Sequence, residues 1–183
     1  MKIISIITIV LFAGLSVSAQ KYFTKNGHIK FHSEAQMETI SANNHQVNSA
    51  LDVKTGDFVF KVLMKAFEFE KALMQEHFNE NYVESDKFPN ATFKGTVDNM
   101  EEINFDIKGE YDIVVKGELT IHGVTKQISR DGILEIKGDK ITAKSKFNIL
   151  LEDYDIKIPN TVVNNISETI EITVDVEMEE YKK

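Results

Sequence analysis

The sequence predicts an all-β protein made of antiparallel strands with one short helix. Three observations support this prediction. Apolar and polar residues alternate along much of the chain, turn residues interrupt the alternation about every ten residues, and one segment has helical spacing instead. Alternation gives each strand one buried and one hydrated face, which is typical of antiparallel sheet. About eight strands at this spacing predict a barrel or a sandwich.

The clearest strands lie in the C-terminal half of the chain. Residues 140–149 and 170–178 place apolar side chains at every second position, with Ser145 as a small polar exception. Residues 57–64 (DFVFKVLM) alternate in the same way, and residues 47–53 supply another inward-facing set. Shorter sets at Phe105–Ile107 and at residues 111–115 predict further strand segments.

Turn residues separate these runs where a strand has to end. Residues 137–140 (KGDK) form a close connection between two strands, and Thr55-Gly56 precedes the phenylalanine-rich strand. The only prolines, Pro89 and Pro159, fall in expected loops or at strand ends, where no ladder bond is lost.

Residues 69–78 have the spacing of a helix rather than a strand. Phe69, Leu73, Met74, His77 and Phe78 fall on one side of a helix of two to three turns. A long polar loop follows and leads into a strand at residues 91–97. We expect this single helix to cap an open end of a barrel.

Residues 118–128 (ELTIHGVTKQI) contain a glycine in the middle of a strand-like run. His122-Gly123 is expected to be a two-residue hairpin turn, because such turns need positive φ at both positions. Glycine takes that conformation freely, and histidine is among the residues enriched there. The predicted strands are residues 111–121 and 124–136. His122 is then a turn residue that asparagine should replace at little cost.

The same hairpin register determines the position of a lysine. Ile121 would pair with Val124 and Leu119 with Lys126, so Lys126 would share a face with apolar side chains. We expect Lys126 at a rim, with its ammonium group in water. The alternative is contact with a polar headgroup at the mouth of the barrel.

The N-terminus has the pattern of a secretory signal peptide. Lys2 precedes an apolar run over residues 3–17, which is too short to span a bilayer comfortably and ends in a small-residue cleavage site. Cleavage is expected after Ala19, leaving residues 20–183 as one exported domain that is periplasmic or secreted, without a stable membrane anchor. The 164-residue mature chain is long enough to bury a sizeable core.

Composition limits the possible partners and chemistry. The mature chain carries 29 acidic and 20 basic residues, so its surface repels nucleic acid and anionic headgroups. The absence of cysteine excludes disulfides and thiol catalysis. No nucleophile elbow, phosphate-binding loop or zinc-protease motif occurs, so neither an enzyme nor a cofactor is expected. His28 and His32 lie about 13 Å apart along one strand, too far to share a metal ion.

Two longer motifs resemble the YceI-like family of exported bacterial proteins. They are GELTIHGVTKQI (residues 117–128) and LMQEHFNENYVESDKFPNATFKG (residues 73–95). The resemblance covers nearly the whole mature chain, although the tryptophan common in the family's first strand is missing here. It implies an eight-stranded antiparallel barrel, lipocalin-like in shape, that binds a long isoprenoid or another amphiphilic lipid in its lumen.

The inward-facing residues are also consistent with a lipid-binding lumen. An eight-stranded barrel either packs solid or holds one small ligand, and deformable methionine and aromatic side chains suit a flexible apolar guest. The candidate lining residues are Phe31, Phe58, Phe60, Met64, Phe67, Phe69, Met74, Phe78, Phe93, Phe105, Phe147 and Ile149. The alternative is that these residues only pack against one another, giving a filled barrel that acts through protein contacts on its surface.

Overall fold

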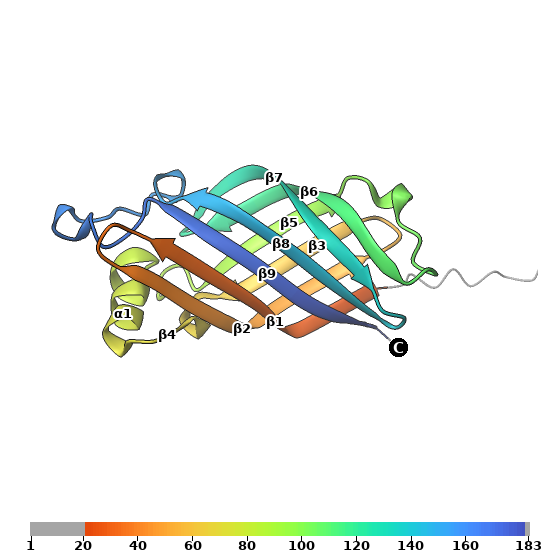
Figure 1. The fold of residues 1–183 in the computed structure, drawn as a ribbon, viewed down its shortest axis with the longest axis horizontal. Helices are drawn as coiled ribbons and strands as arrows, with labels where there is room; N and C mark the ends of the chain where they lie inside the picture. Colours follow the sequence, from red (N-terminus) through yellow and green to blue (C-terminus); the bar gives the residue numbers. More distant parts are fainter. Residues whose placement is uncertain (1–20, 182–183) are drawn as a thin grey trace, which may run out of the picture.

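The structure, a computed structural model, describes residues 21–181 as an antiparallel barrel closed by eight long strands (Figure 1). The strands are β1 (Lys21–Glu34), β2 (Thr39–Asp52), β3 (Asp57–Leu63), β5 (Asn90–Val97), β6 (Gly109–Ile121), β7 (Val124–Ile136), β8 (Lys140–Leu150) and β9 (Thr169–Glu180). Around the barrel the order is β1-β9-β8-β7-β6-β5-β3-β2, and pairing of β1 with β2 closes the ring. The predicted all-β, eight-stranded barrel is therefore confirmed.

One helix lies at an end of this barrel (Figure 1). It is α1 (Ala72–His77), and it continues directly into a π-helical segment, Phe78–Tyr82. The two-residue strand β4 (Glu68–Phe69) precedes α1 and pairs with β2. Short 3-10 turns occupy Met64–Ala66, Met100–Glu102, Glu152–Tyr154 and Asn160–Val162. Within residues 21–181, no helix is both long enough and apolar enough to span a bilayer.

The hairpin between β6 and β7 forms as the sequence predicts. Ile121 pairs with Val124 and Leu119 with Lys126, and His122 and Gly123 have φ values of 50° and 78°. Lys126 is exposed and lies 3.2 Å from Asp153, so its predicted position at a rim is confirmed.

The strand predicted at Phe105–Ile107 is wrong. These residues form a turn before β6, which begins only at Gly109. The side-chain oxygen of Asn104 accepts the N–H of Asp106 at 3.0 Å, and its carbonyl accepts the N–H of Ile107 at 3.2 Å. These two local bonds favour a turn over a strand ladder, although apolar residues still alternate along the segment.

The end of the barrel away from α1 is packed solid. The side chains of Tyr22, Leu51, Leu134, Ile141 and Met178 there are at most 2% exposed. β1 and β9 come so close that a Cβ at Gly27 would lie 2.5 Å from Cγ1 of Val176. Apolar side chains therefore fill this half of the barrel, whereas the half next to α1 is hollow.

Candidate binding cavity

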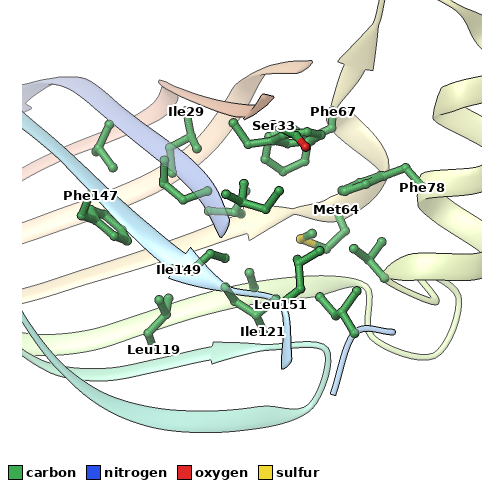
Figure 2. Close-up of a pocket in the computed structure, with 18 of the residues that line it drawn as sticks. Ile29, Ser33, Met64, Phe67, Phe78, Leu119, Ile121, Phe147, Ile149 and Leu151 are labelled. Atoms are coloured by element: carbon green, nitrogen blue, oxygen red, sulfur yellow. The ribbon is translucent and has the colours of Figure 1, made fainter. Parts of the chain in front are cut away.

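The hollow half of the barrel encloses a cavity of about 580 Å³. All eight long strands contribute to its wall, and α1 lies over its end (Figures 1 and 2). The lining is overwhelmingly apolar, and its volume is typical of a site for one small-molecule ligand. The alternation along each strand produces this lining, because every second side chain points inward.

Four phenylalanines form a cluster where α1 meets the barrel. The Phe31 ring of β1 lies 5.5 Å from each of the Phe67, Phe69 and Phe78 rings, measured between ring centroids. Met64 is buried beside this group, and Figure 2 shows Met64, Phe67 and Phe78 around the same end of the cavity. These contacts hold α1 against β1 and at the same time give the ligand space an aromatic end.

A second group of aromatic residues lines the wall formed by β3 and β5. Phe60 lies 4.6 Å from Phe58 and 6.2 Å from Phe93, again between ring centroids. Phe147 and Ile149 project into the same space from β8 (Figure 2).

The structure brings eleven of the twelve predicted lining residues to one cavity. They are Phe31, Phe58, Phe60, Met64, Phe67, Phe69, Met74, Phe78, Phe93, Phe147 and Ile149. Phe105 is the exception, because it lies in the turn before β6 and does not line the cavity. Its inclusion was wrong for the same reason as the strand predicted around it.

Several lining residues were missed from the sequence. Leu119 and Ile121 line the cavity from β6, and the hairpin register already placed both on an apolar face (Figure 2). Leu151 and Ile156 come from the segment after β8, where no periodic pattern marks them. Arg130 of β7 also lines the cavity, and its charge gave no reason to place it there.

The cavity reaches solvent beside α1, because Lys71, Leu73 and His77 line it and are exposed. The neighbouring segments are tied together there. Nζ of Lys71 lies 3.0 Å from Oε1 of Glu38, and the Asn165 amide donates to Oε2 of Glu38 at 3.4 Å. The bond from Lys71 lowers the pKa of Glu38 below its usual range, despite some desolvation, with the Asn165 bond adding to the effect. This cluster links the β1–β2 turn, α1 and the loop before β9.

His122 has a larger role than a turn residue. Nε2 of its ring lies 2.7 Å from Oε2 of Glu84, and Nδ1 lies 3.0 Å from the carbonyl oxygen of Tyr154. The Phe88 ring packs edge-on against it, with the ring centroids 4.7 Å apart. His122 therefore ties the β6–β7 hairpin to the loop after α1 and to the Glu152–Tyr154 turn. The expectation that asparagine would serve equally well took no account of these contacts.

The tyrosines near the cavity have a shifted pKa. Tyr154 is buried beneath the hairpin and Tyr82 lines the cavity, and burial raises the pKa of both phenols. Over the described part of the chain, no group of three or more histidine and carboxylate side chains is placed to hold a metal ion. His28 stacks on His45, with the ring centroids 4.5 Å apart, rather than approaching His32.

An eight-stranded antiparallel barrel with one hollow, apolar end defines the class of barrels that enclose a single small ligand. Within this class, the chain belongs to the YceI-like family, because the YceI-like domain model matches residues 16–178. No curated protein matches the chain in sequence.

Solved structures confirm the same fold. A polyisoprenoid-binding domain from Saccharophagus degradans, described as implicated in plant cell wall breakdown, is 14% identical with a TM-score of 0.76, covering 89% of this chain and 99% of that one. BcnA from Burkholderia cenocepacia is 11% identical with a TM-score of 0.66, covering 82% and 95%. The YceI protein of Campylobacter jejuni is 16% identical with a TM-score of 0.61, covering 82% and 90%. At these identities the likeness extends to the fold.

Proposed function

We propose that the protein binds one apolar, chain-like amphiphile, an isoprenoid or a similar lipid, in the hollow half of its barrel. The observation that carries this proposal is the cavity of about 580 Å³, lined by apolar side chains from all eight long strands. Burial of the ligand's apolar chain supplies the binding free energy, and part of this free energy is lost in ordering a flexible molecule. The fold shared with a polyisoprenoid-binding domain supports the proposal.

The proposed mechanism is sequestration or transport without covalent chemistry. An apolar cavity of this size argues against the alternative of a filled barrel that acts only through its surface. The apolar lining suits binding by burial, and we assign no catalytic role to the chain.

We further propose that the protein acts outside the cytoplasm. The signal-peptide pattern that supports this proposal lies in residues 1–19, which fall outside the described residues. If these residues are a signal peptide, the intact mass of protein from its native host should correspond to a chain beginning at Gln20. A mass that includes residues 1–19 would contradict export by cleavage.

Organic extraction of protein purified from its native host, followed by mass spectrometry of the extract, tests the ligand class. We expect a long-chain amphiphile at about one molecule per protein chain, since an apolar cavity of about 580 Å³ suits one such ligand. The proposal fails if the extract contains no lipid and the extracted protein also takes up no geranylgeraniol, a neutral isoprenoid alcohol.

A further inference from the structure

The barrel wall is incomplete between β7 and β8. β7 pairs with β6 along its whole length, but it pairs with β8 only from Ile133, opposite Lys144, to Ile136, opposite Ile141. Residues 124–132 of β7 and 145–150 of β8 therefore face each other without a ladder, and we call this region the seam. The seam flanks the cavity, because both stretches contribute lining residues.

Side chains bridge the seam where backbone bonds are missing. Oγ of Ser145 donates to the carbonyl oxygen of Asp131 at 2.6 Å. Nη2 of Arg130 donates across the seam to the carbonyl oxygen of Asn148 at 3.4 Å, and Nη1 donates to the carbonyl oxygen of Ser129 at 2.8 Å. The Arg130 guanidinium also lies over the Phe147 ring, 5.4 Å from its centroid. Arg130 is thus held in the wall, beside the ligand space.

Arg130 differs from the other cations of the cavity in having no anionic partner. Lys71 and Lys144 line the same cavity, but they pair with Glu38 at 3.0 Å and with Glu135 at 3.3 Å. Within residues 21–181, no carboxylate forms an ion pair with Arg130, and its buried Nε has no hydrogen-bond partner. Two of the five guanidinium N–H donors are used by the protein, so three remain.

An unpaired guanidinium next to an apolar cavity is unfavourable unless an acceptor reaches it. Carboxylate and phosphate oxygens match its planar set of donors, and such bonds are stronger than those between neutral groups. The half-buried position at the seam lets a charged headgroup stay in contact with water while its chain fills the lumen.

We propose that Arg130 is the headgroup site for an amphiphile whose polar end carries anionic oxygens, either a carboxylate or a phosphate. This inference rests on the proposed binding of a lipid in the lumen, and it specifies the chemical class of that lipid. The apolar chain of the ligand would extend from the seam towards α1, through the part of the cavity lined by Phe147, Ile149 and Leu151. The headgroup would supply the negative charge that the protein does not.

Matched pairs of probes test this site on the delipidated protein. The pairs are palmitate with hexadecanol, and geranylgeranyl phosphate with geranylgeraniol, so each pair differs in the headgroup. We expect at least one acidic probe to bind about tenfold or more tighter than its alcohol, as a charge-assisted bond should give. The pair that shows the preference identifies the headgroup as a carboxylate or a phosphate.

Three variants separate headgroup recognition from closure of the seam. Arg130→Met should weaken binding of the acidic probe about tenfold more than binding of its alcohol, which removes the preference for the acid. Arg130→Lys should restore part of the preference, because it keeps the charge and loses the planar donors. Lys126→Met is the matched control, since it removes a cation from the same strand outside the cavity lining, and it should keep the full preference.

The outcomes distinguish this inference from the proposed function. If the wild type bound acids and alcohols equally, the inferred headgroup site would be wrong. The proposed binding of a lipid in the lumen would not be affected. Equal weakening of all probes by Arg130→Met would show that Arg130 only closes the seam, which also overturns the inference. If the wild type bound none of the four probes, the proposed function would fall and the headgroup site with it.

Discussion

Phe60 and Leu134 both point into the barrel, but only Leu134 has protein atoms on every side. Leu134 is fully buried in the packed half, whereas Phe60 lines the cavity and contacts Phe58 and Phe93 with part of its ring. In the empty protein, Leu134→Ala should lower the free energy of unfolding by about 2–5 kcal/mol. Phe60→Ala should cost only about 1–2 kcal/mol, because fewer packing contacts are lost.

Denaturant unfolding of the delipidated wild type and both variants measures this difference. An equal or larger loss for Phe60→Ala would mean that Phe60 is packed on all sides and that the cavity is filled in solution.

His122 gives a second prediction at the scale of single residues. His122→Asn keeps a residue that tolerates positive φ but removes the ring that contacts Glu84, Phe88 and the Tyr154 carbonyl. The variant should lower the free energy of unfolding by about 1–2 kcal/mol. The measurement is again a denaturant melt, with Lys126→Asn on the same hairpin as a control expected to be nearly neutral. A neutral His122→Asn would show that only the turn conformation matters there.

The position of a side chain could be predicted from the sequence where it depends on a local pattern of residues. Period-two alternation correctly placed Phe58, Phe60 and Ile149 in the lumen, because side-chain direction in a strand follows position alone. Phe105 failed because Asn104 closes a turn whose hydrogen bonds do not show in an apolar–polar pattern. The hairpin register puts Arg130 on the same face as Lys126, but nothing in the sequence shows that Arg130 lies deep enough along the strand to line the cavity.

At the scale of elements, the opening beside α1 is held partly by a titratable contact. Lys71 lowers the pKa of Glu38 through their hydrogen bond, so the charged form of Glu38 stabilises the link between the β1–β2 turn and α1. This contribution is present above the ordinary glutamate pKa of 4.5 and is lost as the pH falls through the lower pKa of the folded protein. Acid should therefore loosen the link between the β1–β2 turn and α1.

The dissociation rate of bound geranylgeraniol measures this loosening. It should rise by about two- to threefold as the pH falls from 6 to below the lowered pKa of Glu38, an effect typical of an exposed ion pair. Lys71→Met should dissociate faster at pH 6 and show a correspondingly smaller rise in acid. The same pH dependence in both proteins would assign the effect to other groups.

The elements differ in how far the sequence determines them. The helix and the β6–β7 hairpin were predictable, because helical spacing and a positive-φ turn pair are local signals. The predicted start of the helix was wrong, however, because Phe69 lies in β4 and α1 begins only at Ala72. The seam was not predictable, because a run of residues does not show where two neighbouring strands stop pairing, and only the three-dimensional register shows that β7 and β8 separate. Strand pairing depends on the curvature of the whole barrel, which one segment does not encode.

At the scale of the whole molecule, the barrel combines a solid end with a hollow one. The packed end, around Leu51, Leu134 and Met178, provides stability that does not depend on a ligand. The hollow end leaves apolar side chains around an unfilled space, which a chain-like ligand would fill favourably. The sequence predicted one inward-facing surface throughout and gave no sign of where its filled part ends.

Native mass spectrometry of the delipidated protein with geranylgeraniol tests the central claim most directly. The wild type should bind one molecule per chain. Leu119→Trp should bind none at the same concentration, because the larger side chain occupies the cavity (Figure 2). Val59→Trp, at a 40% exposed position on β3 outside the lining, should bind like the wild type. A wild type that binds no geranylgeraniol, or a Leu119→Trp variant that binds it as well as the wild type, would contradict a ligand site in the lumen.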